Sequence, residues 1–520
     1  MADYGLGSWP ARRARISPAR TALRQAGRSL TYAGLAGRVD RLAGALARRG
    51  VRPCDRVAYL GLNDIATFEV FFAAGRLGAL FVPMNTRLTA PEIGFLIDDA
   101  RPAVLFHGPE HAAIVAETDP GRRGVGLVVP VAGTGYTELA GETGPAAGPF
   151  DGPGVGLDDP AVILYTSGTT GRPKGAVLSH GNLTFNTMNQ LAHADVLSTD
   201  TALCVSPLFH ATGLSQVSLP TMFKGGTVAV VPQFDPATVL DLIGRLGAAS
   251  FSAVPTMLQL LCDHPGFEAA DLSSLRCVIY GGSMVARRVA VAWQDRGVPL
   301  LQGYGMTEAS PGVYMAPADG AGQRPVSIGV PHFFTDVALT PPGSADAPGS
   351  GVASGAGTEP APGAAGELLV RGPHVFSGYW ERPEATEQAF TDGWFRSGDV
   401  LRTDDDGWAY VVDRIKDMII SGGENVYPAE VEAVIDALPG VSASSVIAVP
   451  DERWGEVGMA FVVAESGAWT AESLRAALAG SLAGFKIPRY VRFVDDLPRT
   501  ATGKVRKQDL RAAAGLGRAP

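Results

Sequence analysis

The sequence has little cysteine, little lysine, no long apolar run and no surplus of basic charge. Its four cysteines, Cys54, Cys204, Cys262 and Cys277, form no CxxC pair, so the ligand spacing of a zinc site is missing and buried, reduced thiols are expected. The net charge of -9, without basic residues clustered among aromatics, disfavours a nucleic-acid partner. The arginines near the start precede no apolar segment of signal-peptide length, and no run approaches ~18 apolar residues. We therefore expect a cytoplasmic protein without integral membrane association.

Lysine is scarce relative to arginine. Six of the 43 basic residues are lysine, which leaves 37 arginines. Such a chain keeps lysine either by chance or where a compact ammonium on a thin, flexible stem is required. Chance would leave the lysines outside motifs, so each one is a functional lead. The six are Lys174, Lys224, Lys416, Lys486, Lys504 and Lys507.

Composition and periodicity predict a globular α/β protein of more than one domain. With 520 residues, 46% hydrophobic and 18% charged, the chain exceeds what one core usually organises. Residues 31–50 show helical apolar spacing after a cap at Thr31, and residues 64–79 form a strongly apolar helix. Short apolar strands are expected at 56–63 and 79–85, and this alternation indicates α/β layers.

The pattern of helix-like and strand-like segments changes after Val411. The remaining segments predict a compact α+β unit of ordinary domain size, with the boundary near residues 411–420. Earlier, the Gly-, Ala- and Pro-rich stretch 341–365 lies between strand-like segments and is expected to extend a hairpin loop. The predicted helices of the last unit are 428–441 and 471–485, and its strands are 444–451, 458–465 and 490–498.

The stretch Tyr165 to Gly175, YTSGTTGRPKG, follows a buried-type strand at residues 161–164. Its glycines allow backbone amides to converge on an anion, its hydroxyls add donors and Lys174 adds positive charge. This combination suits a polyphosphate. It is not a Walker A loop, because Pro173 precedes the lysine and no Ser or Thr follows it. A flexible turn is the alternative for a short Gly/Ser/Thr-rich loop, and the length of the string argues against it.

Several further stretches accompany this loop, and together they resemble the motifs of the AMP-forming acyl-activating superfamily in the same order. The superfamily includes acyl-CoA synthetases, nonribosomal adenylation domains and beetle luciferases. The stretches are PLFHATG (207–213), YGGS (280–283), GYGMTE (303–308), WFRSGD (394–399), DRIKDMIISGGENVYPAEVE (413–432) and PRTATGK (498–504).

The resemblance implies a fold and an activity. It implies a large N-terminal domain, residues 1–413, of layered α/β subdomains with a small distorted barrel. A small mobile α+β domain, residues 414–520, would rotate about a hinge at Lys416. The implied reaction is ATP-dependent ligation of a carboxylic acid to CoA through an acyl-AMP intermediate, with release of AMP and pyrophosphate.

The resemblance also implies catalytic roles. Lys504 would stabilise charge that develops between carboxylate and phosphate, His210 would lie between the acyl pocket and the phosphates, and Glu308 with Thr166 would hold Mg²⁺. The implied ATP and AMP contacts are Thr166, Ser167, Gly168, Thr169, Thr170, Gly171, Lys174, Gly281, Gly282, Ser283, Tyr304, Gly305, Thr307, Asp399, Arg414 and Lys504. The YGGS stretch departs from the GGAP of many relatives at Ser283 and Met284.

The second half-reaction and the acid have implied sites of their own. The implied CoA contacts are Ser421, Gly422, Gly423 and Glu424, and the implied substrate contacts are Phe209, His210, Tyr280 and Gly303. These last residues are mostly apolar or small, which favours a fatty or aromatic acid. No arginine among them would pair a second carboxylate.

Two alternatives remain beside the CoA ligase. The first is a stand-alone adenylating enzyme that transfers the acyl group to a carrier-protein pantetheine or to another nucleophile. The second is a nucleotide-binding regulatory protein without catalysis. The presence of Asp399, Arg414, Glu308 and Lys504 argues against the second alternative.

Overall fold

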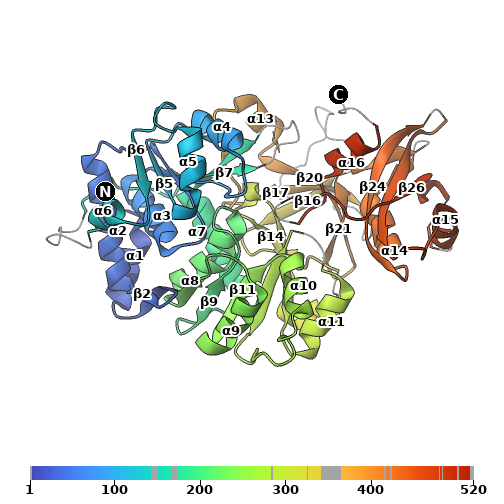
Figure 1. The fold of residues 1–520 in the computed structure, drawn as a ribbon, viewed down its shortest axis with the longest axis horizontal. Helices are drawn as coiled ribbons and strands as arrows, with labels where there is room; N and C mark the ends of the chain where they lie inside the picture. The colour runs from blue at the N-terminus through green and yellow to red at the C-terminus, as the bar shows by residue number, and fades with distance from the viewer. Residues whose placement is uncertain are drawn as a thin grey trace. The chain divides into compact units, whose positions relative to one another are not determined.

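The computed structural model divides the chain into two compact units (Figure 1). The first comprises Met1–Asp336 and Arg371–Gly393, and the second Val337–Val370 and Trp394–Pro520. The structure describes residues 3–141, 150–166, 173–282, 285–324, 326–340, 363, 365–414, 417–421, 424–451, 453–479, 481–482, 484–500 and 503–515.

One sheet of the first unit has seven strands in the order β18-β8-β7-β4-β3-β5-β6. The pairs from β7 through β4, β3 and β5 to β6 are parallel, whereas β8 and β18 are antiparallel additions at one edge. The strands are β3 (Arg56–Leu60), β4 (Leu80–Pro83), β5 (Val104–His107), β6 (Leu127–Pro130), β7 (Pro160–Thr166), β8 (Lys174–Ser179) and β18 (Gly378–Tyr379).

The other sheet has nine strands in the order β15-β14-β13-β12-β11-β9-β10-β1-β2. Its centre, from β13 to β1, is parallel, and both edges are antiparallel. The strands are β1 (Thr21–Gln25), β2 (Arg28–Thr31), β9 (Thr201–Cys204), β10 (Thr227–Val230), β11 (Ala248–Ala253), β12 (Cys277–Gly281), β13 (Leu300–Gly305), β14 (Gly312–Met315) and β15 (Val330–Pro331).

Helices separate and cover these sheets. Helix α7 contacts β8 of one sheet and β14 of the other, so it packs between the layers. The main helices are α1 (Trp9–Ile16), α2 (Tyr32–Arg48), α3 (Ile65–Leu77), α4 (Ala90–Ala100), α5 (Ala112–Thr118), α6 (Thr134–Leu139), α7 (His180–His193), α8 (Leu219–Lys224), α9 (Pro236–Leu246), α10 (Pro255–Asp263), α11 (Arg287–Asp295), α12 (Ala318–Ala321) and α13 (Pro383–Gln388). A π-helix, η3 (Thr212–Ser218), precedes α8, and a short turn of helix, η4 (Thr307–Ala309), follows β13.

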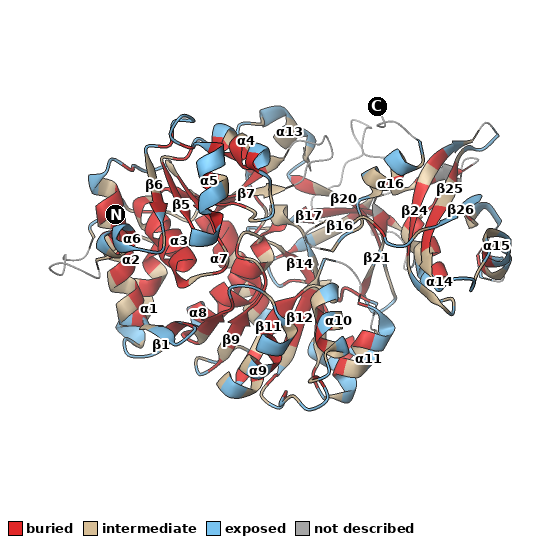
Figure 2. Ribbon diagram, viewed as in Figure 1, coloured by how far each residue is buried: buried red, intermediate tan, exposed pale blue. Residues whose placement is uncertain are grey.

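Buried residues lie both on the strands and on the helices that pack against them, coloured red in Figure 2. On one face of the nine-stranded sheet, α9, α10 and α11 enclose a core in which Trp293 is fully buried against Phe251 and Phe267. Such close packing of large rings is what fixes helices on a sheet.

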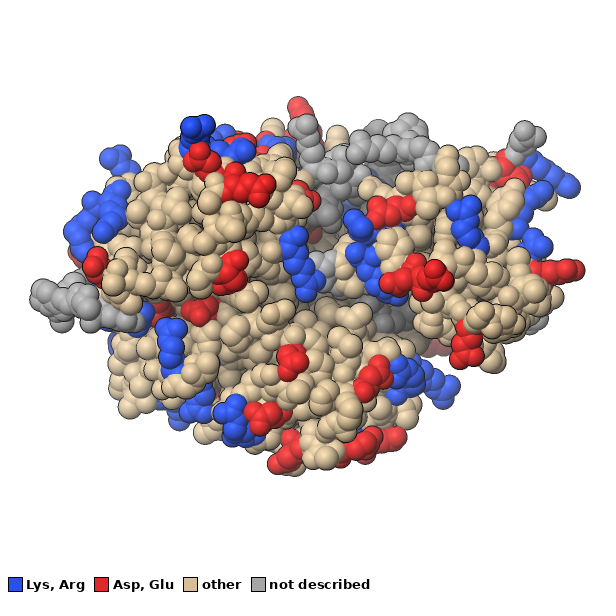
Figure 3. Space-filling model, viewed as in Figure 1, with Lys and Arg blue, Asp and Glu red and all other residues tan. Residues whose placement is uncertain are grey.

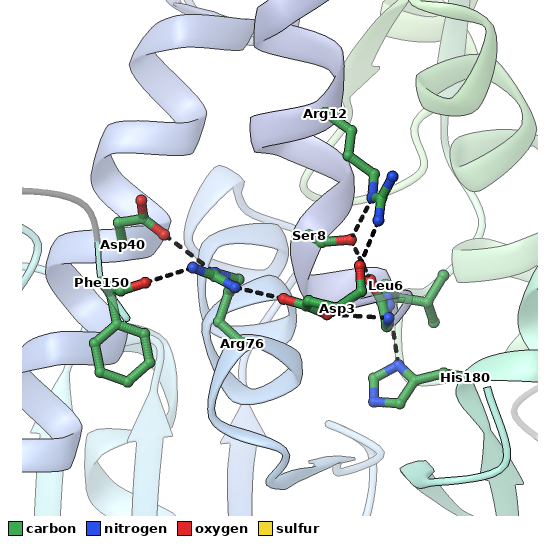
Figure 4. Close-up of polar contacts among 9 residues, drawn as sticks. Asp3, Leu6, Ser8, Arg12, Asp40, Arg76, Phe150 and His180 are labelled. Carbon is green, nitrogen blue, oxygen red and sulfur yellow. Dashed lines mark hydrogen bonds and ion pairs between the residues drawn. The ribbon is translucent and has the colours of Figure 1, made fainter. Parts of the chain in front are cut away.

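The first residues of the chain are anchored by a partly buried polar cluster (Figure 4). Arg76 of α3 pairs with Asp3, contacts Asp40 of α2 at 3.2 Å, and donates to the Phe150 carbonyl at 2.6 Å. The amide of Leu6 donates to His180 Nδ1 at 3.1 Å. One guanidinium with five donors thus joins segments that lie far apart in the sequence.

The second unit contains two sheets. The first joins β16 (Asp336–Thr340), β17 (Gly366–Arg371), β20 (Trp394–Thr403) and β21 (Ala409–Arg414). The resemblance implied a small distorted barrel in the large domain, and the described residues of these strands pair as an open sheet. The second sheet joins β22 (Ile419–Ser421), β23 (Glu424–Val426), β24 (Val441–Asp451), β25 (Gly455–Ala464) and β26 (Tyr490–Phe493), together with helices α14 (Pro428–Asp436), α15 (Ala471–Leu478) and α16 (Lys507–Ala513).

The predicted fold class is confirmed: two α/β layers form the large unit, and an α+β region ends the chain. Thr31 caps α2 as predicted, because its side chain accepts from the Gly34 amide at 3.0 Å. The strands on either side of the 341–365 stretch are neighbours in one sheet, as a hairpin requires; residues 341–362 lie outside the described part.

All four cysteines are free thiols, as expected, but only Cys204 is buried. Cys262 and Cys277 are partly exposed, and Cys54, which has a φ of +66°, is exposed, so the predicted burial was wrong for these three residues. The compact units also divide the chain at other positions than residue 413. A division by contacts within one conformation does not show where a domain rotates. The domain boundary at residue 413 and the hinge at Lys416 therefore stay predictions. Lys416 lies outside the described part.

Candidate active site

The Gly/Thr-rich loop is carried by a β-hairpin. Thr166 ends β7 and Lys174 begins β8, and the two residues are partners in the antiparallel register. The Thr166 hydroxyl donates to the Lys174 carbonyl at 3.3 Å. The hairpin therefore fixes both ends of the loop, although residues 167–172 lie outside the described part.

Tyr379 links Lys174 to Glu308. Its hydroxyl donates to Glu308 Oε1 at 2.8 Å, and Lys174 Nζ lies 5.3 Å from the centre of its ring. Burial and the adjacent Glu308 carboxylate raise the pKa of Tyr379, which keeps this hydroxyl protonated as a donor. The amide of Phe376 donates to the Glu308 carbonyl at 2.8 Å. Glu308, Thr166 and Lys174, predicted separately, thus belong to one cluster.

The strand that carries Tyr379 is fixed beside the hairpin. β18 pairs with β8 through Tyr379 and Ala176, and Asp99 at the end of α4 forms its outer anchor. The Asp99 carboxylate accepts from Tyr165 at 2.7 Å and pairs with Arg382 at 2.5 Å, while the Asp99 carbonyl accepts from Trp380 Nε1 at 3.2 Å. A buried carboxylate bonded to a guanidinium and a phenol is a rigid attachment point.

His210 ends a tight turn, residues 207–210, before the π-helix. Its amide donates to the Pro207 carbonyl at 3.1 Å, and its ring lies 4.6 Å from that of Phe209. Asn63, only 6% exposed, holds the preceding chain: its side chain donates to the Ser206 carbonyl at 3.0 Å and accepts from the Leu208 amide at 2.8 Å. The turn is therefore set by a residue near the end of β3, in the other sheet.

The ends of β12 and β13 supply a glycine-lined surface. Gly281 and Gly303 are register partners, and a side chain at Gly281 would lie 2.8 Å from the Gly303 carbonyl oxygen. Gly282 has a φ of +94°, which favours glycine. Tyr304 packs edge to face on Tyr314 of β14, with centroids 6.0 Å apart. Glycine at Gly281 thus allows the two strands to approach closely at this edge of the sheet.

Tyr280 lies on the opposite face of the same sheet. Successive strand residues alternate between faces, and the Tyr280 ring is buried with Trp293 in the core beneath α10 and α11. Its hydroxyl donates to Gln302 Oε1 at 2.9 Å beside a cavity of about 290 Å³. The substrate role of Tyr280 stays a prediction.

The two predicted ribose contacts lie side by side in the second unit. Asp399 on β20 and Arg414 on β21 are register partners, and Asp399 is 4% exposed. Asp413, which precedes Arg414, accepts from the Ala429 amide at 2.8 Å and so fixes the start of α14. Backbone pairing brings Asp399 and Arg414 together.

Lys504 lies at a turn, as its motif predicted. Thr500 and Lys504 exchange hydrogen bonds of 2.7 and 3.2 Å, and Arg499 bridges to Val505. Gly503 in this turn has a φ of +83°, which a side chain would disfavour. The turn presents Lys504 as an exposed residue.

Two other lysines have structural partners. Lys486 pairs with Glu430 at 2.7 Å and Lys507 with Glu432 at 3.0 Å, so both lysines tie their segments to α14. These two lysines therefore have a structural role in the second unit.

The implied CoA segment is a hairpin of β22 and β23. Ser421, 6% exposed, is the register partner of Glu424. Gly422 and Gly423 lie outside the described residues, as do Ser167, Gly168, Thr169, Thr170, Gly171, Ser283 and Lys416. The predicted contacts of these residues stay predictions.

Charge and apolar length add two observations. On the face shown in Figure 3, basic and acidic side chains are interspersed and form no single basic patch. Among the helices that the structure describes, none has the length and hydropathy that crossing a bilayer requires.

Comparison with known proteins identifies the class. A family profile described as AMP-binding enzyme matches residues 10–380, and one described as AMP-binding enzyme C-terminal domain matches residues 430–504. The chain therefore belongs to the AMP-binding enzyme family, and its predicted resemblance to the acyl-activating superfamily is confirmed.

Particular relatives are similar over nearly the whole chain. A feruloyl-CoA synthase from an Amycolatopsis species is 49% identical, over 99% of this chain and 100% of its own length. An indoleacetate–CoA ligase of Aromatoleum aromaticum is 40% identical, with 97% of each chain covered. The crystal structure of ATP-bound MatB from Rhodopseudomonas palustris has a TM-score of 0.87 at 34% identity, with 98% of each chain covered.

Sequence reasoning missed Tyr379, Asp99 and Asn63. Each acts through a contact with a segment more than 60 residues away in the chain. The sequence signal that could have indicated them is a polar or aromatic residue beside a strand. The SGYW stretch around Tyr379 and the LND stretch around Asn63 both have this pattern.

Proposed function

We propose that this protein is an ATP-dependent carboxylic acid:CoA ligase whose substrate is an aromatic acid. The cluster of Thr166, Lys174, Glu308 and Tyr379 around the hairpin carries the proposal. The feruloyl-CoA synthase and indoleacetate–CoA ligase relatives, both acting on aryl acids by name, favour an aromatic over a fatty acid.

The first half-reaction forms an acyl adenylate. A carboxylate oxygen of the acid attacks the α-phosphorus of ATP, and the bond from that phosphorus to the bridging oxygen breaks to release pyrophosphate. Thr166 and Lys174 hold the phosphates, with the loop residues between them. The exposed ammonium of Lys504 neutralises the reacting oxygens as the transition state forms.

The proposed nucleoside contacts are those that the family motifs imply. Asp399 accepts hydrogen bonds from both ribose hydroxyls, because a carboxylate offers two acceptor oxygens, and Arg414 beside it reaches the same sugar. Tyr304 packs on the adenine. The remaining backbone contacts come from Gly281, Gly282, Ser283, Gly305 and Thr307.

Mg²⁺ would be held by Glu308 and the Thr166 hydroxyl together with phosphate oxygens. This donor set fits the preference of Mg²⁺ for one or two carboxylates beside substrate phosphates. The cation supplies charge neutralisation on the phosphates when bound. The fixed orientation of the Glu308 carboxylate through Tyr379 supports the assignment.

In the second half-reaction the CoA thiol attacks the acyl carbonyl and AMP leaves. Rotation of the small domain about Lys416 would replace Lys504 by the hairpin at Ser421 and Glu424, so one cavity serves two reactions in turn. His210 lies between acyl and phosphate sites. Free CoA is the acceptor here; a carrier-protein pantetheine is the alternative.

The cellular setting is part of the proposal. We place the enzyme in the cytoplasm, without a nucleic-acid partner. The net charge of -9 supports the second point, because it offers no attraction to a phosphate backbone.

The test separates the two half-reactions. Acid-dependent exchange of labelled pyrophosphate into ATP measures adenylation, and mass detection of the thioester measures transfer. We expect Lys504→Ala to lower adenylation by at least ~100-fold and to leave transfer from a presupplied acyl adenylate nearly unchanged. The control is Lys224→Ala, at an exposed lysine outside every motif. Adenylate without any thioester would refute CoA as acceptor, and equal loss of both steps would refute the role of Lys504.

A further inference from the structure

A small cavity lies within the first unit, beside α7, η3, β11 and β12. It measures about 20 Å³, and its lining includes Gln190, Gln216, Ser250, Cys277 and Ile279. This volume accommodates one water-sized group. The cavity is too small for a ring and suits a single substituent.

Two glutamines, Gln190 and Gln216, line this cavity. Gln190 is 2% exposed and Gln216 is 6% exposed. In the described structure the Oε1 atoms of both residues are buried without a hydrogen-bond partner. A buried acceptor without a donor costs free energy, so two such acceptors on residues that line one cavity favour a ligand that donates a hydrogen bond.

The cavity lies on the same face of β12 as the implied substrate surface. Cys277, Ile279 and Gly281 alternate onto one face, at about 7 Å per two residues, and Gly281 pairs with Gly303. Gln216 Nε2 is only 3.0 Å from the position that a side chain at Gly303 would occupy. The Gln216 carboxamide therefore separates the glycine pair from the cavity.

Gln216 also belongs to the segment that carries the implied acyl contacts. It lies in η3, two positions before the end of that helix, and η3 directly follows the turn at His210. A helix that begins beside the reacting carboxylate and reaches this cavity can contact both ends of a short, rigid acid.

We propose that Gln216, supported by Gln190, binds a hydroxyl group on the aromatic ring of the acid and so makes the enzyme selective for hydroxylated aryl acids. The ring hydroxyl donates to Gln216 Oε1, and the carboxylate at the other end faces the ATP site. This inference rests on the proposed function, since it assigns a substrate class to the same acyl pocket.

The test compares 4-hydroxycinnamate with cinnamate, which lacks only the ring hydroxyl, by acid-dependent pyrophosphate exchange. We expect wild type to favour 4-hydroxycinnamate by about ten- to a hundredfold in kcat/KM, because cinnamate leaves a buried acceptor unpaired. In Gln216→Leu the ratio should fall to within about threefold, and Gln190→Leu should lower it less. Because both acids are compared in the same variant, the ratio of their kcat/KM values does not depend on the fraction of that variant that is folded.

The control is Gln388→Leu, at an exposed residue that ends α13, which should keep the wild-type ratio. Equal use of the two acids by wild type would overturn the inference and indicate that the cavity holds only a water molecule. An undiminished ratio in both Gln216→Leu and Gln190→Leu would also overturn it. Exchange with neither acid nor any other aryl acid would refute the proposed function itself.

Discussion

A buried ion pair joins helices α2, α3 and α6 and offers a sharp test of how the first unit is stabilised. Glu69 of α3 is fully buried, and its Oε2 accepts from Arg38 Nη2 of α2 at 3.1 Å while a second contact joins Arg38 Nε to Oε1. The Tyr136 hydroxyl of α6 donates to the same carboxylate. Burial and the Glu69 charge raise the pKa of Tyr136, so this hydroxyl stays a donor.

The perturbation is Glu69→Leu, which removes the acceptor from both partners. Breaking a buried pair by removing one charge typically costs about 3–5 kcal/mol, and an orphaned buried hydroxyl adds about 1–3 kcal/mol. We therefore expect a loss of about 4–8 kcal/mol in the free energy of unfolding, a large share of the ~5–15 kcal/mol of a typical protein. Replacing all three polar groups, in Arg38→Leu/Glu69→Leu/Tyr136→Phe, should restore most of it.

Urea unfolding, followed by tryptophan fluorescence and by circular dichroism, measures these differences in the free energy of unfolding. Where the curves from the two probes coincide, the variant unfolds in one step. Asp241→Asn is the control: it breaks an exposed pair with Arg245, whose atoms lie 3.0 Å apart, and should cost less than ~1 kcal/mol. If the triple variant proved no more stable than Glu69→Leu, the loss would come from packing and not from uncompensated charge.

Three further predictions concern pH, the site and the backbone. Burial lowers the pKa of His180 to about 4, so this imidazole binds a proton more readily in the unfolded chain than in the folded protein. We therefore expect His180 to lower the free energy of unfolding by about 2 kcal/mol between pH 7 and pH 5. Urea unfolding at both pH values measures this change. Tyr379→Phe removes the hydrogen bond to Glu308 and should lower adenylation by about tenfold or more, with a higher Mg²⁺ requirement in pyrophosphate exchange. Gly305→Ala would place a carbon 1.6 Å from the Pro311 carbonyl oxygen and should cost about 3 kcal/mol or more of unfolding free energy.

Matched controls and contrary outcomes accompany these predictions. In His180→Gln, the loss of stability between pH 7 and pH 5 should be smaller by about 2 kcal/mol. An unchanged loss would contradict its assignment to His180. Tyr490→Phe alters an exposed tyrosine of β26 and should leave exchange and Mg²⁺ dependence as in wild type. Gly135→Ala, in α6 with no neighbour near the added carbon, should be neutral or stabilising; equal losses at both glycines would argue against the close approach.

Local sequence patterns were enough to predict part of the structure and the family of this protein. The helix after Thr31 follows from a capping residue and apolar residues at helical spacing, and the strand before Thr166 follows from a short apolar run. The acyl-activating family followed from ordered motifs, each contained within about 20 residues. These features depend on neighbours in the chain, which is why the amino-acid sequence by itself determined them.

Contacts between distant segments were decided only by the tertiary structure. β18 returns to the edge of the seven-stranded sheet and so brings Tyr379 to Glu308, and η3 aligns Gln216 with Gly303 across a sheet face. The pairing of Asp399 with Arg414 depends on a strand register that includes a bulge. Strand order, register and face are set by packing of the whole core, and no local spacing in the sequence encodes them.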